Sequence, residues 1–296
     1  MKSTLDCIVC FVRQSLDAAR MVSQDPAVHE RILREVLQWT AEMDMRTPPP
    51  VIGQRIHRLL KEVSGNRDPY REAKAQSNHM ALALLHDLRK LVNAAPDPLE
   101  LALRLALAGN VIDMGVSSAI SASDIRDAVD QATTEPLVGP LAQFQQALGQ
   151  ARTILYLADN AGEIVFDRLL VEQLGPERVT LAVRGAPVIN DATLDDAKAA
   201  GFGELVPIVE NGSDAPGTLL EDCSETFRRH FETADLIIAK GQGNYETLNM
   251  ERRNIFFLFQ AKCSVIAAHV GLPQGTHVLA TPHIAGDGAI GTNGGG

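Results

Sequence analysis

The sequence lacks any long apolar segment. No run reaches the roughly 18 consecutive apolar residues that a membrane-spanning helix needs, and this argues against a helical membrane protein. Residues 1–7 also lack the apolar core of a signal peptide. We therefore expect a cytoplasmic protein whose four cysteines stay reduced.

Basic residues are scarce relative to acidic ones. The chain has 27 Lys and Arg against 37 Asp and Glu, which gives a formal net charge of −10. No basic stripe offsets this charge, so the composition argues against a nucleic-acid-binding protein. It is compatible with a soluble enzyme, in which a small anionic substrate would need local positive groups such as Lys240 and Arg184.

Zinc-type patterns of cysteine and histidine are missing too. Cys7 and Cys10 form a CxxC pair, but there is no second CxxC, and Cys223 and Cys263 lie far apart in the sequence. The eight histidines include no zinc-type pair on a helix. A zinc site or a thioredoxin-like motif is therefore weakly supported. We expect the two cysteines to pack on a helix as small apolar residues.

The rhythm of the chain changes at about residue 150. Before this point, apolar residues recur at helical spacing, which predicts helices over 27–42, 51–63, 78–93 and 96–108. After it, strand, polar turn and helix alternate, which predicts βαβ units and a parallel sheet. The predicted domains are a helical region over 1–145, an α/β domain over 146–284 and a glycine-rich, disordered tail over 285–296.

The α/β domain has a predicted order of elements. Apolar runs predict strands over 152–158, 178–183 and 234–239, and Pro207 places a short strand over 204–209 at an edge. Helices are predicted over 166–174, 193–200, 218–233 and 247–259. A strand over 263–268 and a fading strand after residue 275 complete the domain.

Polar side chains follow three of these strands. Ligands of open α/β sheets bind outside the carboxyl ends of the strands. Two carboxylates and a carboxamide there suit a hard divalent cation such as magnesium or manganese. A lysine beside flexible glycines suits the phosphate that such a cation would polarise. The residues concerned are Asp159 and Asn160, then Asn190 and Asp191, and then Lys240, Gly241, Gly243 and Asn244.

The two Asx pairs also have a plainer interpretation. Asp159 and Asn160, like Asn190 and Asp191, precede predicted helices, and Asp and Asn are favoured helix N-caps. Their separation of about one βα unit favours the functional interpretation, because adjacent parallel strands would bring the pairs together. Glu163 either stabilises the dipole of the following helix, or supports the metal ligands, or acts as a general base.

Other polar residues are equally compatible with a structural role. Arg184 and Lys240 suit solvated surface charges, although their positions at strand ends favour contact with a phosphate. Asn110 and Asp113 suit an ordinary helix end with a polar turn.

Taken in order, the motifs resemble the damage-control phosphatase family, first catalogued as domain of unknown function 89. The resemblance covers nearly the whole chain, and the CxxC pair is similar to the prokaryotic branch. Ala192 departs from the valine that is commoner in the family, a change of packing and not of ligands. The motifs are Cys7-x-x-Cys10, Asp68-Pro69-Tyr70, Gly109-Asn110-Val111-Ile112-Asp113, Asp159-Asn160-Ala161-Gly162-Glu163, Pro187-Val188-Ile189-Asn190-Asp191-Ala192-Thr193, Ser213-Asp214-Ala215-Pro216-Gly217-Thr218 and Lys240-Gly241-Gln242-Gly243-Asn244-Tyr245-Glu246.

The resemblance implies a fold, a metal and an activity. The fold is a three-layer α/β/α sandwich with a mostly parallel sheet and a helical N-terminal region. The metal is Mn²⁺, Co²⁺, Ni²⁺ or Mg²⁺, held by Asp159, Asn160 and Asp191, with phosphate contact near Lys240 and its glycines. The activity is hydrolysis of phosphate esters of small metabolites, such as sugar phosphates or damaged phosphometabolites.

We therefore interpret the chain as a metal-dependent phosphatase. Attack by water and a covalent phospho-aspartate at Asp159 both stay open. The alternative is a sugar-phosphate or nucleotide-binding protein without turnover; a methyltransferase is a lesser one, because the usual glycine-rich loop after the first strand is missing. The physiological substrate, the metal and the oligomeric state are not predicted. The predicted catalytic residues are Asp159, Glu163 and Lys240, and the predicted substrate contacts are Asn110, Asp113, Arg184, Lys240, Gly241, Gly243 and Asn244.

Overall fold

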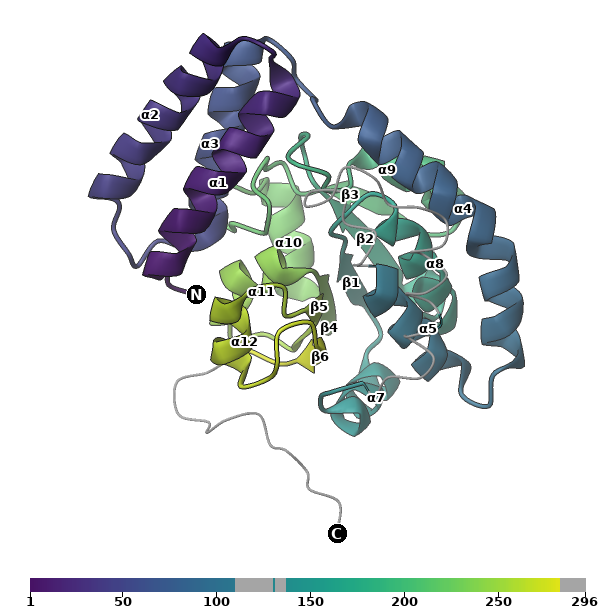
Figure 1. The fold of residues 1–296 in the computed structure, drawn as a ribbon. Helices are drawn as coiled ribbons and strands as arrows, with labels where there is room; N and C mark the ends of the chain where they lie inside the picture. Colours follow the sequence, from purple (N-terminus) through teal and green to yellow (C-terminus); the bar gives the residue numbers. More distant parts are fainter. Residues whose placement is uncertain (110–129, 131–136, 283–296) are drawn as a thin grey trace.

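The computed structural model of the chain describes residues 1–109, 130 and 137–282 (Figure 1). Its N-terminal helices are α1 (Leu5–Val22), α2 (Pro26–Glu42), α3 (Pro49–Ser64), α4 (Arg71–Ala94) and α5 (Pro98–Ala108). They are followed by α7 (Leu141–Gln150), β1 (Ile154–Leu157), α8 (Glu163–Leu174), β2 (Val179–Val183), α9 (Leu194–Ala199), β3 (Ile208–Glu210), α10 (Glu225–Thr233), β4 (Leu236–Lys240), α11 (Gln242–Leu248), β5 (Ile255–Gln260), α12 (Ser264–Val270) and β6 (His277–Ala280). The predicted disordered tail over 285–296 lies outside the described residues.

The N-terminal helices begin where side chains satisfy free backbone N–H groups. Asp25 accepts a hydrogen bond from the backbone N of Ala27 (2.9 Å), and Asp97 accepts one from Glu100 (3.0 Å). A proline occupies the first turn of each of these helices, where its missing N–H costs nothing. Sequence and local geometry therefore agree on where these helices start. In the described residues, no helix is long and apolar enough to cross a bilayer.

Six strands form one sheet in the order β3-β2-β1-β4-β5-β6, parallel except for β6. Every residue of the central strands β1 and β4 is buried, as expected for parallel strands covered on both faces. β1 pairs with β2 on one side and with β4 on the other, so the carboxyl ends of these three strands meet at one edge. The predicted mostly parallel α/β fold and the edge position of β3 are confirmed.

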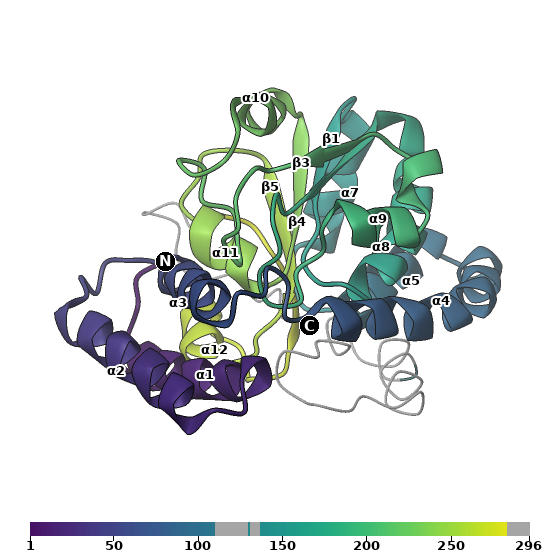
Figure 2. The same cartoon turned by 90° about the horizontal axis from the view of Figure 1, so that it is seen from above.

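Helices cover both faces of the sheet, and Figures 1 and 2 show the layers from two directions. On one face, α4, α5, α7, α8 and α9 share an apolar core with the sheet, and this core includes the fully buried Phe144 and Leu170. On the other face, α10, α11 and α12 do the same around Phe227 and Tyr245. α1, α2 and α3 have a core of their own, so the predicted helical region has two parts that pack differently.

Two predicted elements near the C-terminus are wrong. The helix predicted over 247–259 is a strand, β5, preceded by the short helix α11, and the strand predicted over 263–268 is helix α12. Five of the six residues of β5 are buried, so this strand has no alternation of polar and apolar residues to distinguish it from a helix. Helix α10 begins at Glu225 and not at residue 218, because the Ser224 side chain caps it at Phe227.

Candidate active site

The backbone brings the two predicted Asx pairs together. Ala192 donates a backbone hydrogen bond to the carbonyl of Asp159 (2.7 Å), and Ala161 donates one to Asn190 (2.8 Å). Asn160 and Asp191 thereby form an isolated antiparallel bridge beyond the ends of β1 and β2. Ile189, just before the second pair, has a φ of 44°, a conformation that a β-branched residue rarely adopts. Asp159, Asn160 and Asp191 therefore lie next to one another at the edge of the sheet.

Negative charge is crowded at this point. Asp159 and Asp191 are almost completely buried. Burial, followed by the charges of Asp191 and Glu163, raises the pKa of Asp159 well above its usual range. Asn160 donates its amide protons to Asp159 Oδ2 (2.8 Å) and Glu163 Oε2 (3.0 Å), which leaves its carbonyl oxygen available as a ligand. A divalent cation would relieve this crowding.

The donor set fits a hard cation but is not complete. No three His, Cys, Asp or Glu side chains of the described residues are arranged to hold a metal ion. The candidate set consists instead of two carboxylates and one carboxamide, and magnesium- or manganese-like ions commonly complete such sets with water and substrate oxygens. Asp159, Asn160 and Asp191 are the residues that would hold the ion.

Arg184 provides positive charge beside the two carboxylates. It is buried, its Nε donates to Asp191 Oδ2 (2.6 Å), and its Nη1 donates to Asn244 Oδ1 (3.3 Å) and Thr218 Oγ1 (3.4 Å). Its Nη2 has no hydrogen-bond partner among the described residues and lies 3.7 Å from Asp159 Oδ1. An arginine with an unused N–H group at this point is suited to bind an anionic oxygen.

Lys240 does not lie where the sequence suggested. It is completely buried, and its Nζ donates to Glu163 Oε1 (2.5 Å), Asp167 Oδ1 (2.6 Å) and the carbonyl of Ala106 (2.7 Å). Asp167 also accepts from the hydroxyl of Tyr156 (2.8 Å). Burial alone would lower the pKa of Lys240, but the charges of Asp167 and Glu163 raise it, so the amine stays protonated. All three N–H groups are used within the protein, which differs from the expected direct phosphate contact.

The residues after Lys240 pack closely against the site. Gly241 has a φ of 80°, and a Cβ there would collide with the carboxylate of Asp159. A Cβ on Gly243 would collide with the carbonyl of Pro216. Asn244 is completely buried, and its amide donates to the carbonyl of Lys240 (2.7 Å). Both glycines are thus required by close packing, and their contact with phosphate stays a prediction.

A loop from residue 211 to 224 connects this site to the N-terminal helices. Asp214 of this loop accepts hydrogen bonds from Gln54 (2.9 Å), Arg58 (2.9 Å) and Lys61 (2.7 Å) of α3. Burial alone would raise the pKa of Asp214, but these partners lower it to about 2. The same loop contains Thr218, which accepts a hydrogen bond from Arg184. Helix α3 is therefore connected to Arg184 through this loop.

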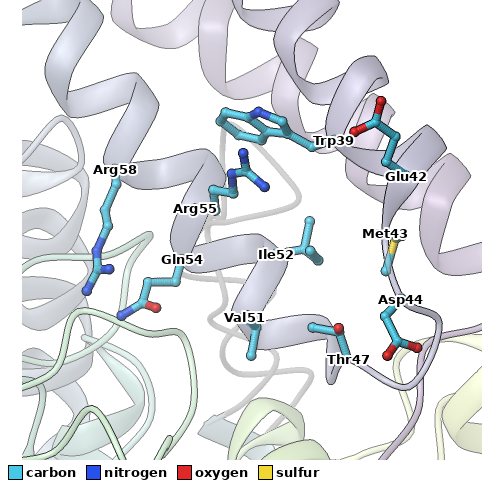
Figure 3. A pocket seen from close by; sticks show the side chains of 10 residues that line it. All are labelled: Trp39, Glu42, Met43, Asp44, Thr47, Val51, Ile52, Gln54, Arg55 and Arg58. Carbon is cyan, nitrogen blue, oxygen red and sulfur yellow. The ribbon is translucent and has the colours of Figure 1, made fainter.

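Three hollows in the surface of the described residues are not lined by Asp159 or Asp191. A groove of about 520 Å³ lies between α2 and α3 (Figure 3), where Arg55 stacks on the ring of Trp39 at 3.9 Å. Gln54 and Arg58 line this groove and also reach Asp214. A smaller hollow beside Ile189 has a volume of only about 10 Å³. The candidate site is therefore identified by its carboxylate, carboxamide and guanidinium groups, and not by the size of a cavity.

Several expected residues have a different outcome. Asn110 and Asp113 lie outside the described residues. Cys7 packs in the core of α1–α3, as expected, whereas Cys10 is exposed; all four cysteines are free. Asp167 was missed, although its position four residues after Glu163 puts both carboxylates on one face of α8. No sequence signal indicated that this face pairs with Lys240.

Comparison with known proteins places the chain among phosphatases. The family described as damage-control phosphatase ARMT1-like domain matches residues 3–278. A damage-control phosphatase of Pyrococcus horikoshii is 33% identical over 94% of this chain and 97% of its own length, and one of Archaeoglobus fulgidus is 33% identical over 94% and 98%. An uncharacterized protein of Methanocaldococcus jannaschii is 36% identical over 93% of each chain. The crystal structure of a DUF89 family protein from Pyrococcus horikoshii has a TM-score of 0.85 at 32% identity, and the match covers 96% of this chain and 100% of that one.

Proposed function

This chain belongs to the damage-control phosphatase ARMT1-like family and is a metabolite phosphatase, and we propose that it hydrolyses phosphate monoesters with the help of a divalent metal ion. The family resemblance expected from the motifs is confirmed. The observation that carries the proposal is the convergence of Asp159, Asn160 and Asp191 beside an arginine with an unused N–H group. The metal is proposed to be Mn²⁺, Co²⁺, Ni²⁺ or Mg²⁺.

We propose that the ion contributes Lewis acidity and that the protein positions the phosphate. Asp159, Asn160 and Asp191 would hold a divalent cation, which would supply charge stabilisation toward a phosphoryl oxygen. Arg184 Nη2 would bind a second phosphoryl oxygen, because its other nitrogens are already used by Asp191, Asn244 and Thr218. Removing one such donor from a transition state commonly costs about 2.7–4 kcal/mol.

Glu163 and Lys240 hold the candidate metal ligand Asn160 in place. Glu163 is completely buried, and it accepts from Asn160 with one oxygen and from Lys240 with the other. This supports a positioning role, in which Glu163 fixes which atom of the Asn160 amide faces the ion. Lys240 then acts through Glu163 and not by contact with phosphate. The alternative of Glu163 as a general base predicts that Glu163→Gln loses the low-pH limb of the pH–rate profile, on which the rate rises with pH.

The route of hydrolysis is testable. Asp159 lies at the site as either a metal ligand or a nucleophile. A single turnover of a substrate with a radioactive phosphoryl group, quenched in acid, would leave label on an enzyme carboxylate only if a phospho-aspartate forms. We propose direct attack by water, and a labelled Asp159 would contradict this.

The central experiment compares turnover and stability. Asp159→Ala and Asp191→Ala should abolish hydrolysis of p-nitrophenyl phosphate and of a panel of phosphometabolites in the presence of manganese, while thermal melts show folded protein. Asp195→Ala is a matched control, since Asp195 is an exposed carboxylate four residues after Asp191. Loss of activity that follows unfolding would mean that Asp159 and Asp191 are structural caps. Saturable binding of phosphorylated ligands without turnover would favour the non-catalytic alternative.

A further inference from the structure

Asn78 is a buried polar residue of helix α4, with 3% of its surface exposed. Its side-chain oxygen accepts a hydrogen bond from the backbone N of Gly162 (2.7 Å), and its side-chain nitrogen donates to Asp196 Oδ1 (2.9 Å). One amide therefore bridges two segments that are far from it in the sequence. Both hydrogen bonds are buried, where the loss of either partner leaves a polar group unpaired.

The two segments are those that carry the candidate metal ligands. Gly162 follows Asn160 by two residues, and its φ of 80° turns the chain from the ligand pair into α8. Asp196 follows Asp191 by five residues and accepts hydrogen bonds from the backbone N (2.9 Å) and hydroxyl (2.7 Å) of Thr193. A shift of either segment would move its ligand relative to the other.

Apolar packing already holds α4 on the domain. Ala81, Leu85, Leu88 and Val92 of this helix belong to the core shared with the sheet. A polar anchor is not needed for docking, and a buried amide is costly unless both its ends are satisfied. Lys74, one turn earlier, reaches Asp196 (3.3 Å) and Asp68 (2.9 Å), whereas Asn78 also reaches the Gly162 segment.

We propose that Asn78 is a positioning residue for the metal centre: it fixes the separation of the Asp159–Asn160 and Asp191 segments before any ion binds. This inference rests on the proposed metal-dependent function. Residues that orient metal ligands from behind typically contribute about 10- to 100-fold in metal affinity or activity. Asn78 acts through backbone and capping contacts and touches neither ion nor substrate.

The test measures manganese affinity by titration calorimetry, together with the apo protein's stability and its turnover. Asn78→Ala should weaken manganese binding by about 10- to 100-fold. Ser77→Ala is the matched control, because Ser77 is equally buried in α4 but its hydroxyl donates to the carbonyl of Ala73 (3.0 Å) within the same helix. It should keep the wild-type dissociation constant.

A swapped pair separates positioning from stability. Asn78→Asp alone places two carboxylates together and should weaken manganese binding, and Asp196→Asn alone should weaken it too. In the double variant Asn78→Asp, Asp196→Asn, the carboxylate at position 78 can still accept from the backbone N of Gly162, and the amide at position 196 can donate to it. The bridge therefore re-forms with donor and acceptor exchanged. The double variant should recover most of the manganese affinity, a rescue that a purely structural role would not predict for the folded single variants.

The outcomes also distinguish this inference from the proposed function. If the wild-type protein binds no manganese and needs no metal for turnover, both are overturned. If the wild-type protein binds manganese and folded Asn78→Ala binds it equally well, only the role of Asn78 is overturned. Should Asn78→Ala not fold, the swapped pair decides: affinity that stays low in the folded double variant overturns the inference.

Discussion

Two clusters of charged residues at the end of the sheet have a similar composition but differ in solvent exposure and in whether the cation has an unused N–H group. In one, Lys240 lies between Glu163 and Asp167; in the other, Arg184 lies between Asp159 and Asp191. The lysine cluster has no solvent exposure, and every N–H of the lysine is bonded. The arginine cluster is slightly exposed, with 12% of the Asp159 side chain accessible, and one nitrogen lacks a partner among the described residues.

The difference indicates that one cluster has a structural role and the other can bind ligands. In the lysine cluster the cation has no N–H group left for an anion, although Asp167 Oδ2 has no hydrogen-bond partner among the described residues. The contribution of this sealed cluster is to hold α8, β1 and β4 in place. A cluster with an unused donor and two crowded carboxylates has capacity for both an anion and a cation. Glu163 connects them, because it accepts from Lys240 in the first and from Asn160 beside the second.

Removing the lysine should give the largest effect on stability. Lys240→Met leaves Glu163 and Asp167 buried without their counter-charge, and we expect a loss of about 3–5 kcal/mol in the free energy of unfolding. Urea denaturation at neutral pH measures this. Lys90→Met, at an exposed helical pair, is the control and should change stability by less than about 0.5 kcal/mol. A stable Lys240→Met protein with greatly reduced kcat/KM and unchanged manganese affinity would instead support the direct phosphate contact expected from the sequence.

Removing the arginine should mainly affect catalysis. Arg184→Gln loses the unused donor, and we expect kcat/KM to fall by about 10²- to 10³-fold, with a smaller loss of stability from the lost hydrogen bond to Asp191. Steady-state kinetics with manganese and a urea titration on the same preparation separate the two quantities. Arg229→Gln, at an exposed pair on α10, serves as the control. Unchanged kinetics in Arg184→Gln would place the phosphate elsewhere.

The stabilisation that Asp214 provides through its hydrogen bonds to α3 should depend on pH. The pKa of Asp214 is lowered to about 2 in the folded protein, so its contribution is present above the ordinary carboxyl pKa and is lost as the pH falls through about 2. Asp214→Asn should therefore be less stable than the wild type at pH 5–7, by about 1 kcal/mol because solvent screens Arg58, and the difference should shrink towards pH 2. A difference that is independent of pH would contradict this.

Neutralising Asp159 should slightly stabilise the metal-free protein. The pKa of Asp159 is raised in the folded state. The free energy of unfolding of the wild type therefore falls as the pH rises from the pKa of Asp159 in the unfolded chain towards its pKa in the folded protein. With a chelator present, Asp159→Asn should be more stable than the wild type at pH 7 and similar to it in acid. Thermal melts across pH test this, and a destabilised variant at pH 7 would identify Asp159 as a structural cap.

The cysteine pair should have the smallest effect on chemistry. Cys7 and Cys10 lie in α1, which contributes no residue to either cluster, and the proposed reaction needs no thiol. The double variant Cys7→Ser, Cys10→Ser should keep most of its activity with manganese supplied, and a modest loss of stability would come from Cys7, which is buried. A folded, metal-loaded variant without turnover would reopen a redox or zinc role.

Much of the fold was predictable because local patterns were strong. The strands over 152–158, 178–183 and 234–239 are present as β1, β2 and β4, and α2, α3 and α5 lie close to the expected positions. Helix α4 begins earlier than predicted, and α1 was not predicted as a separate helix. The prediction failed at β5 and α12, where short apolar runs fit a helix and a strand equally well. Pairing with β4 and β6 decides that β5 is a strand, and no local window contains those partners.

The sequence by itself determined which residues end the strands, and therefore that Asp159, Asn160 and Asp191 would lie at one edge of a parallel sheet. Only the tertiary structure decided which positive charge is available there. Lys240 is sealed by Asp167 and Glu163, which lie 73 and 77 positions away in the chain, while Arg184 retains an unused nitrogen. Asn78 meets Asp196 across 118 positions. Burial and hydrogen-bond saturation depend on every neighbour in space, and residue type and spacing along the chain do not specify them.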